Sequence, residues 1–582
     1  MNSRTAFIAA LLLMSQSCMA LAQEVWPGRV LIKFSEEISL AALRVVDGIV
    51  KVDLADFDQA AMTYGIYEAD KIFKGAQKPE ESYYTDLSRW YRLEFSADID
   101  PAVVVSALEK LACTEEVEVD RKCYQTYRPN DIFYDNCWFL TQIHADEAWY
   151  ITKGSAEVVI AIVDSGIDSG HVDLKSEMWV NPGEDLNGNG IVDLEDWNGA
   201  DDDQNGYVDD FWGWDFASMD NIPHPDNPSE NHGTLCASSA AAATDNIEGV
   251  ASPGFNTRLM ALRSNMYVNN LSSCITYAAD NGADILSNSW GSNTFSPVIR
   301  DAVAHCHDVG AMFVTSAGNN DYWTPPWPAY PSLYPDVLSV GATTESDQMA
   351  TFSNYCTTPF DGVIDVMAPG QNILSASTLG TYETWQGTSS SSPITAGVCA
   401  LVLSIDPTLT PAEVETLLVH GCDDIYPQNP SFAYGILGHG RINALKTILQ
   451  ISHYLSFYSL TLTDIGNGDG RADPGETVEL SIVVQNHPEA QIAEGITGML
   501  VCDDEAVTVT SGSVSYGSVM PGEIGFNSTP YTFTVAATDP HWTEFSVILT
   551  DTYGSEQEVS FELELGRPEI LVVDDDGGEN YQ

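Results

Sequence analysis

The stretch that decides the fold is Gln386-Gly387-Thr388-Ser389-Ser390-Ser391-Ser392-Pro393, which continues as Ile394-Thr395-Ala396-Gly397-Val398-Cys399-Ala400-Leu401. Glycine and small hydroxyl residues lead into a proline and then into small and apolar residues on every side. This pattern predicts a tight turn followed by a buried helix. Ser389 would lie at the N-terminus of that helix, where free backbone N–H groups and the helix dipole stabilise an oxyanion. The alternative is a simple loop with a helix cap.

Two other stretches supply an acid and a base. The apolar run over residues 158–163 ends at Asp164 and a turn, as expected for a parallel strand buried on both faces. His232 opens an alanine-rich segment that favours a helix. Acid, then base, then nucleophile is one of the chain orders in which the Asp–His–Ser triad occurs.

These motifs resemble those of the subtilisin-like serine protease family, the subtilases. Asp164-Ser165-Gly166, His232-Gly233-Thr234 and Gly387-Thr388-Ser389 with Pro393 match its three catalytic motifs. Ser316-Ala317-Gly318-Asn319 matches a fourth, and the resemblance covers residues 155–447. It implies a serine endopeptidase with Asp164, His232 and Ser389 as the triad and Asn319 as the oxyanion-hole side chain. Its partners would be protein or peptide substrates.

Four positions depart from the family pattern. The usual glycine before the histidine is Asn231, and the usual methionine after the serine is Ser390. Ile394 and Thr395 replace the usual histidine and valine. None of the four removes a group with a chemical role, so we expect them to bear on cleft shape and rate.

The N-terminus has the features of a secretory signal peptide. Arg4 precedes an apolar run over residues 6–14, and Ala20-Leu21-Ala22 offers small residues at the cleavage positions. A lipoprotein signal at Cys18 is the alternative, but Ser15-Gln16-Ser17 before it fits poorly. No later apolar run is long enough to span a bilayer. We expect residues 1–22 to be removed and the protein to be secreted or to lie at the cell surface.

The chain is long and strongly acidic. Its 582 residues are enough for three or more domains. With 84 Asp and Glu against 23 Lys and Arg, the formal charge is −61. Such a chain favours cations and repels nucleic acid, which is thereby excluded as a partner. An aromatic content of 10% argues against disorder over most of the chain.

Four segments follow the signal peptide. Residues 23–127 read as a small α+β unit that resembles the family's inhibitory propeptide, and a permanent N-terminal domain is the alternative. Residues 128–450 alternate strands and helices, which predicts an α/β domain with a parallel sheet and helices on both faces. Residues 455–566 show strands alone and predict a β-sandwich, which could contact carbohydrate, protein or a surface. Residues 567–582 look like the start of a further domain.

An acidic insertion over residues 181–215 has the spacing of calcium loops. Its first run places oxygen ligands at positions one, three, five, seven, nine and twelve, with glycine at six, as in an EF-hand loop. The ligands of this run would be Asp185, Asn187, Asn189, the carbonyl of Ile191, Asp193 and Asp196. A second run repeats the pattern less completely with Asp201, Asp203, Asn205 and Asp209, and Asp210 could substitute at its end. A third run, in the β-sandwich, contains Asn467, Asp469, Asp473 and Glu476. We predict structural Ca²⁺ in these loops, and flexible polar loops are the alternative.

The 11 cysteines are plausible disulfide material in an exported protein. Cys113 and Cys123 are close enough in sequence to pair, whereas Cys399 lies in the apolar helix and is expected to be a buried thiol. Cys236 follows His232 by four residues, so we predict its thiol beside the imidazole on one helical face. Subtilases related to proteinase K carry a free cysteine there, and a structural disulfide is the alternative.

Two functional classes fit these features. The first is a secreted serine endopeptidase that forms an acyl-enzyme. The second is a calcium-dependent surface adhesin whose protease domain is a degenerate scaffold. The intact residues Asp164, His232, Asn319 and Ser389 favour the enzyme.

Overall fold

The computed structural model describes residues 25–566 except 36–42, 47, 74–85, 97–98, 122–126, 321–329, 356–363, 431–434, 467, 469–470 and 537–540. The chain divides into two compact units, Met1–Gln125 and Thr126–Gln582. The predicted signal peptide and the strand expected near residues 568–573 lie outside the described residues.

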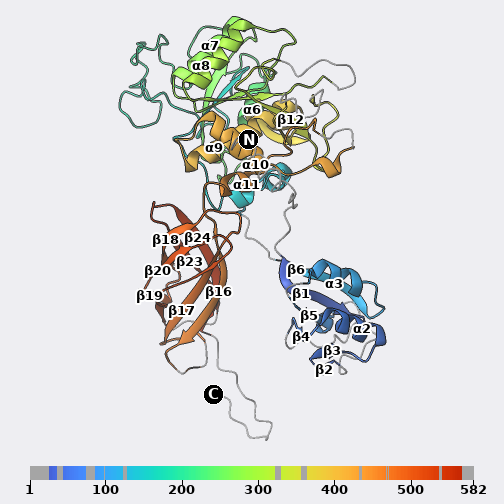
Figure 1. Ribbon diagram of the computed structural model, residues 1–582. Coiled ribbons are helices and arrows are strands. Elements are labelled where there is room, and N and C mark those ends of the chain that lie inside the picture. Colours follow the sequence, from blue (N-terminus) through green and yellow to red (C-terminus); the bar gives the residue numbers. More distant parts are fainter. Residues whose placement is uncertain are drawn as a thin grey trace, which may run out of the picture. The chain divides into compact units, whose positions relative to one another are not determined.

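The first unit is an antiparallel sheet with helices packed on it (Figure 1). Its strand order is β4 (Glu68–Lys71), β5 (Trp90–Glu94), β1 (Val25–Phe34) and β6 (Thr114–Arg121). The helices are α2 (Ala55–Tyr64) and α3 (Pro101–Leu108), and a hairpin joins β2 (Arg44–Val46) and β3 (Ile49–Lys51). Val30, Ile32 and Phe34 alternate along β1 and are fully buried against the helices, as the apolar alternation predicts.

The second unit contains a parallel sheet in the order β13-β12-β11-β10-β7-β9-β8. The strands are β7 (Val159–Asp164), β8 (Gly213–Asp215), β9 (Arg258–Arg263), β10 (Ile285–Asn288), β11 (Met312–Ser316), β12 (Leu338–Thr343) and β13 (Val366–Pro369). Side chains of β7 alternate between two cores, with Ile160 and Ile162 in one and Val159, Ala161 and Val163 in the other. This double burial explains the continuous apolar run, and the predicted parallel α/β fold is confirmed.

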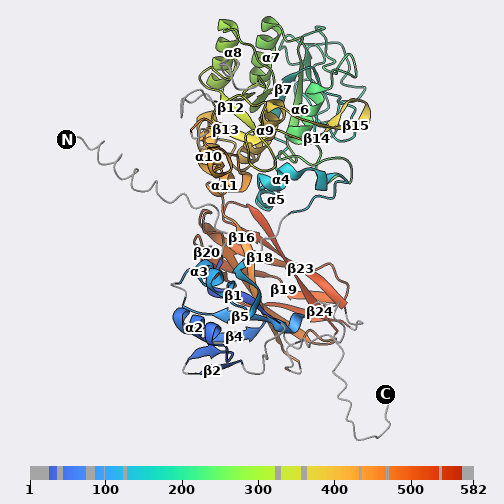
Figure 2. The same ribbon diagram turned by 90° about the vertical axis from the view of Figure 1, so that its right-hand side faces the viewer.

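Helices cover both faces of this sheet (Figures 1 and 2). The first core is shared with α4 (Trp138–Gln142), α5 (Ala145–Ala148), α6 (His232–Ala241), α9 (Thr388–Ile405), α10 (Pro411–Gly421) and α11 (Ala444–Leu449). The second core is shared with α7 (Val268–Asp280) and α8 (Pro297–Asp308). By length and composition α9 could cross a membrane, but 89% of it is buried in the protein. It is therefore the central core helix that the Ser389 stretch predicts.

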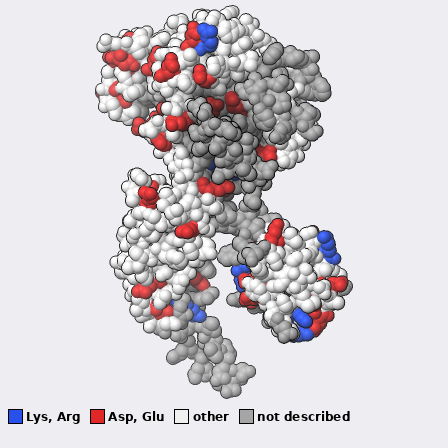
Figure 3. All heavy atoms as spheres, viewed as in Figure 1, with Lys and Arg blue, Asp and Glu red and all other residues white. Residues whose placement is uncertain are grey.

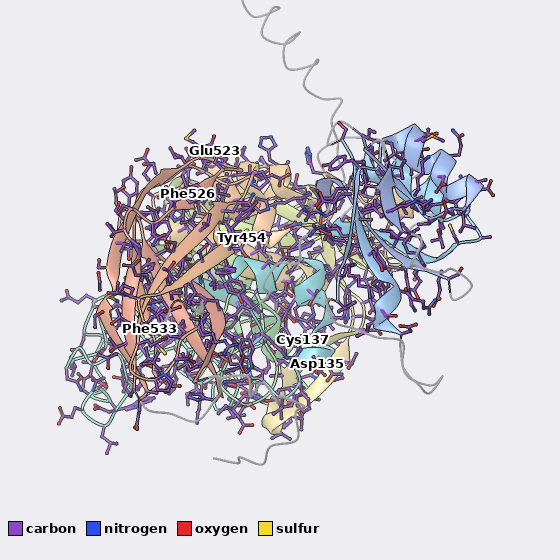
Figure 4. The ribbon with its side chains drawn as sticks, turned by 90° about the horizontal axis from the view of Figure 1, so that it is seen from below. Asp135, Cys137, Tyr454, Glu523, Phe526 and Phe533 are labelled. Atoms are coloured by element: carbon purple, nitrogen blue, oxygen red, sulfur yellow. The ribbon has the colours of Figure 1, made fainter. Side chains whose placement is uncertain are left out.

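Two antiparallel sheets at the C-terminal end form the predicted β-sandwich. One has the order β16 (Leu455–Asp464), β17 (Thr477–Asn486), β22 (Tyr531–Val535) and β19 (Val507–Ser511), with β21 (Ile524–Phe526) also paired to β17. The other has the order β20 (Ser513–Val519), β18 (Ala493–Val501), β23 (His541–Thr550) and β24 (Glu556–Leu565). Alternate residues of β17 enter the core between the sheets together with Phe533, whereas Phe526 is 61% exposed (both labelled in Figure 4).

The cysteines correct one expectation. All eight that lie within the described residues carry free thiols, and most are buried. A buried thiol packs as a small apolar group, which accounts for these positions without disulfides. Cys113 is free and buried, while its suggested partner Cys123 lies outside the described residues. Cys399 is a fully buried thiol in α9, as predicted.

Candidate active site

The end of β7 and the start of α6 bring Asp164 and His232 together. Asp164 is 1% exposed, and its Oδ1 and Oδ2 lie 2.9 and 3.0 Å from His232 Nδ1. The buried carboxylate raises the pKa of the imidazole well above its usual value. Asp164 accepts the hydrogen bond from Nδ1–H, so Nε2 is the atom that accepts a proton when the ring is neutral.

Gly233 allows this close approach. A Cβ at Gly233 would lie 2.4 Å from the carbonyl oxygen of Gly166 and 3.1 Å from Asp164 Cβ. The Gly233 N–H donates to Ser165 Oγ at 3.0 Å, which ties the start of α6 to the turn after β7. The glycine after the histidine is therefore required by packing of the helix against the strand end.

Ser389 lies in the first turn of α9, where its side chain is buried. Its Oγ donates to the carbonyl oxygen of Ser289 at 3.4 Å, and Ser289 Oγ donates to the Ser389 carbonyl at 2.9 Å. Among the hydrogen bonds of the described residues, none joins Ser389 Oγ to His232. Such hydrogen bonds are often long in free enzymes and tighten when substrate binds.

Cys236 lies beside the acid and the base. Its Sγ is 3.8 Å from His232 Nδ1 and 3.8 Å from Asp164 Oδ2, and it donates to the Ser389 carbonyl at 3.5 Å. The thiol is free and buried. The predicted position beside the imidazole is therefore confirmed, and the disulfide alternative is wrong.

Asn319 and the N-terminus of α9 place two nitrogen donors beside Gly387. Asn319 Oδ1 accepts the Thr388 N–H at 2.8 Å and the Thr388 hydroxyl at 3.0 Å, so Nδ2 is left to donate elsewhere. A Cβ at Gly387 would lie 3.3 Å from Asn319 Nδ2 and 3.5 Å from the Ser389 N atom. A side chain at Gly387 would therefore crowd both nitrogen atoms.

Sequence reasoning missed the hairpin that borders His232. Strands β14 (Ile373–Ser377) and β15 (Thr381–Trp385) pair just before α9. The Trp385 ring meets the His232 ring edge-on, with centroids 5.6 Å apart, and Trp385 Nε1 donates to Ser375 Oγ at 2.9 Å. Only the closeness of Trp385 to Gly387 in the sequence could have indicated that Trp385 lies beside His232.

The first acidic run closes on itself. The Asp185 carboxylate accepts the N–H groups of Gly188 and Gly190 at 2.8 and 2.6 Å. Asp193 Oδ2 accepts the side-chain amides of Asn187 and Asn189 at 3.0 and 3.2 Å. The structure thus brings four of the predicted ligands into one loop.

The far end of this run is anchored by Asp196. Its carboxylate is fully buried and accepts the N–H groups of Leu186 and Asp193 at 3.1 and 2.8 Å. The Ile191 side chain is 65% exposed, and its N–H donates to Asn189 Oδ1.

The second run brings three of its predicted ligands together. The Asn205 N–H donates to Asp201 Oδ1 and Asp203 Oδ1, both at 3.0 Å, so these three residues lie together. Asp209 does not join them, because its backbone adopts a φ of 50° and its carboxylate accepts the Gly199 N–H at 3.1 Å. The role of Asp209 as a calcium ligand stays a prediction.

Asp210 takes the place beside Asn205. It is fully buried, and its carboxylate accepts the amides of Asn181 and Asn205 and the hydroxyl of Tyr277 in α7. Burial raises the pKa of this carboxyl.

Acidic side chains far outnumber basic ones on the face shown in Figure 3.

The third run is described only in part. Asn467 and Asp469 lie outside the described residues, while Asp473 and Glu476 lie partly buried in the turn before β17. The Glu476 N–H donates to the Asp473 carbonyl oxygen at 3.2 Å.

Comparison with known proteins agrees with this geometry. The profile of the subtilase family matches residues 155–436. A thermophilic serine proteinase of a Bacillus species is 31% identical over 351 residues, which are 59% of this chain and 75% of the relative. Thermitase of Thermoactinomyces vulgaris is 30% identical over 329 residues, 55% of this chain and 99% of the relative. An extracellular protease of Xanthomonas campestris is 31% identical over 376 residues, 60% of this chain and 61% of the relative.

The segment matched by the family contains Asp164, His232, Asn319 and Ser389. The relatives that match it carry the names of serine proteinases and proteases, and none of them gives support to the adhesin alternative. The chain belongs to the subtilase family and is a subtilisin-like serine endopeptidase.

Proposed function

We propose that this chain is a secreted endopeptidase in which Ser389 is the nucleophile, His232 the general base and Asp164 the residue that orients the imidazole. The observation that carries the proposal is that Asn319 Nδ2 and the Ser389 N atom both lie next to Gly387, beside the Ser389 side chain. Two donors close together beside a serine side chain fit the developing charge of a tetrahedral intermediate.

In the proposed reaction, Ser389 Oγ leaves the Ser289 carbonyl, gives its proton to His232 and forms a bond to the peptide carbonyl carbon. The oxyanion accepts hydrogen bonds from Asn319 Nδ2 and the Ser389 N–H. His232 then protonates the leaving amine as the C–N bond breaks, while Asp164 stabilises the imidazolium. Water hydrolyses the acyl-enzyme by the same proton transfers in reverse.

Export and processing are part of the proposal. The name of the Xanthomonas relative, an extracellular protease, supports secretion, and the signal peptide at residues 1–22 would direct it. The unit built on β1 would be the inhibitory propeptide, cut off within residues 122–127. The β-sandwich would lie outside the catalytic chemistry and could contact a surface or carbohydrate.

Structural Ca²⁺ in the acidic insertion is also proposed. The first run gathers aspartate and asparagine side chains around one short turn of chain, and their oxygens are the hard ligands that Ca²⁺ prefers. Ca²⁺ bound there would hold the loop in place and take no part in bond cleavage.

Casein hydrolysis by the purified, processed protein tests the proposed function. We expect activity that Ser389→Ala abolishes without changing the circular dichroism spectrum. Equal activity in both proteins would exclude Ser389 as the nucleophile. If both wild type and Ser389→Ala were folded and neither hydrolysed casein, the proposed protease activity would be excluded.

A further inference from the structure

The Cys236 thiol is a third potential metal ligand beside the acid and the base, and the proposed reaction does not use it. Its Sγ lies 3.8 Å from both His232 Nδ1 and Asp164 Oδ2, and those two atoms are 3.0 Å apart. One ligand atom each from Asp164, His232 and Cys236 therefore lies within 4.8 Å of the other two. The three side chains bring oxygen, nitrogen and sulfur together at the corners of a small triangle.

The size of this triangle suits a zinc ion. With Zn–S near about 2.3 Å, Zn–N near about 2.05 Å and Zn–O near about 2.1 Å, a regular tetrahedron places sulfur about 3.6 Å from each of the other two atoms and nitrogen about 3.4 Å from oxygen. The observed edges differ from these by roughly 0.2–0.4 Å, so small side-chain movements would let one ion contact all three atoms.

The type of ligand selects zinc over calcium or magnesium. Thiolate and imidazole are ligands of zinc, whereas calcium and magnesium take oxygen ligands. Asp164 and Cys236 are each 1% exposed, whereas the His232 side chain is 41% exposed. An ion would therefore enter from the side of the imidazole, and a water molecule would complete the tetrahedron there.

We propose that Asp164, His232 and Cys236 bind one Zn²⁺ ion and that this ion inhibits the protease reversibly. Binding replaces the proton of the Cys236 thiol, which passes to water. The imidazole keeps its single proton, which moves through water from Nδ1 to Nε2 as the ion takes the electron pair of Nδ1.

This change of tautomer removes the base of the proposed reaction. In the absence of the ion, Nδ1–H donates to Asp164 and Nε2 has a free electron pair. With the ion on Nδ1, Nε2 carries the proton and cannot accept another from Ser389. The inhibition rests on the proposed function, whereas binding of the ion does not.

Binding can be tested in full-length Ser389→Ala protein, which cannot digest itself. Millimolar Ca²⁺ would be present throughout, so that sites made only of oxygen ligands do not take up the probe. Equilibrium dialysis would count Zn²⁺ per chain, and Co²⁺ would report a thiolate ligand through a sulfur-to-cobalt charge-transfer band in the near ultraviolet. We expect Cys236→Ala in this protein to bind one Zn²⁺ fewer and to lack the band.

Cys274→Ala is the matched control. It removes a thiol that is also buried, from α7 in the second core, and should keep both the bound ion and the cobalt band. Cys236→Ser preserves the volume of the side chain and replaces Cys236→Ala if the alanine variant does not fold. Unchanged zinc stoichiometry and an unchanged cobalt band in a folded Cys236 variant would overturn the proposed site.

Inhibition is measured on the processed enzyme that retains Ser389. Cys236→Ala should need about 100-fold or more zinc for half-inhibition of peptide hydrolysis, because loss of a ligand weakens a metal site at least as much as loss of a group that orients one. Wild type and Cys274→Ala should be inhibited alike and recover when EDTA and excess Ca²⁺ are added. Equal inhibition of wild type and Cys236→Ala would show that zinc acts elsewhere. If wild type has no activity to inhibit, the proposed function fails, and the binding measurements still decide whether the zinc site exists.

Discussion

Gly387 lies next to the two proposed oxyanion-hole donors, Asn319 Nδ2 and the Ser389 N–H. Replacing it with alanine puts a methyl group 3.3 Å from Asn319 Nδ2 and 3.5 Å from the Ser389 N atom. We expect Gly387→Ala to lower kcat by about 100-fold or more, because loss of one oxyanion-hole donor has an effect of this order. Steady-state kinetics on a peptide ester and a peptide amide would measure it.

Gly282→Ala is the matched control for this substitution. Gly282 also has a positive φ, 87°, but a Cβ there meets nothing within 4 Å. The control should lose about 1–3 kcal/mol of stability from backbone strain and retain full kcat. If Gly387→Ala and Gly282→Ala were equally active, the space at Gly387 would not be the oxyanion hole.

The position of Cys236 leads us to expect that mercurials inhibit the enzyme. Mercury bound to its Sγ, which is 3.8 Å from His232 Nδ1, should displace the imidazole and stop hydrolysis. Cys236→Ala should retain most activity and become resistant, because the thiol has no part in catalysis. Cys274→Ala, which removes a buried thiol from the other core, should stay sensitive. Inhibition of Cys236→Ala at the wild-type mercurial concentration would place the reactive thiol elsewhere.

Single residues divide into those that local sequence predicts and those that it does not. Asp164 and Ser389 stand at the end of a buried strand and the start of a buried helix, and both boundaries have a pattern in the sequence. Glu184 lies outside the loop spacing, and its burial depends on how the fold places Gly183 against the Asp203 side chain. Spacing also cannot show that the Asp209 carboxylate accepts the Gly199 N–H while the Asp210 carboxylate accepts the Asn205 amide, because these contacts depend on the folded path of the chain.

Among the secondary-structure elements, the contact between β12 and the start of β13 leads us to expect that stability depends on pH. Asp365, at the start of β13, accepts the Ser339 N–H at 2.7 Å, and loss of water around it raises its pKa to about 7. The folded state then holds a proton that the unfolded state has lost, so its stability falls as pH rises from about 4 to 7. We expect Asp365→Asn to melt above wild type near pH 8 but not near pH 4.

The control for Asp365 is Asp424→Asn. Asp424 is exposed and also accepts a backbone N–H, that of Tyr426 at 2.9 Å. Its replacement should leave the pH dependence of the melting temperature unchanged. A uniform shift in Asp365→Asn at every pH would contradict the assignment.

The sequence predicts where the strands lie along the chain better than it predicts which strands are neighbours in the sheet. Apolar runs located β7, β9, β10 and β11 to within a few residues, because each strand is covered on both faces. The sheet order, in which β7 lies between β10 and β9, depends on contacts between segments far apart in sequence. Periodicity along the chain contains no information on those contacts.

For the molecule as a whole, we predict removal of the N-terminal unit by the protein itself. Purified wild type should begin within residues 122–127, whereas Ser389→Ala should retain the propeptide, as intact-mass measurement would show. A trace of active enzyme should trim Ser389→Ala at the same bond. If Ser389→Ala is cut there in the absence of active enzyme, a host protease makes the cut.

The enclosure of α9 has a further consequence for heat inactivation. Its residues 388–403 are all buried, and Ser389 stands in its first turn. Amides in so enclosed a helix exchange with deuterium only when the surrounding domain opens as a unit. The nucleophile therefore cannot fray away from its neighbours while the domain persists, and the temperature at which hydrolysis is lost should coincide with the temperature at which α9 becomes deuterated.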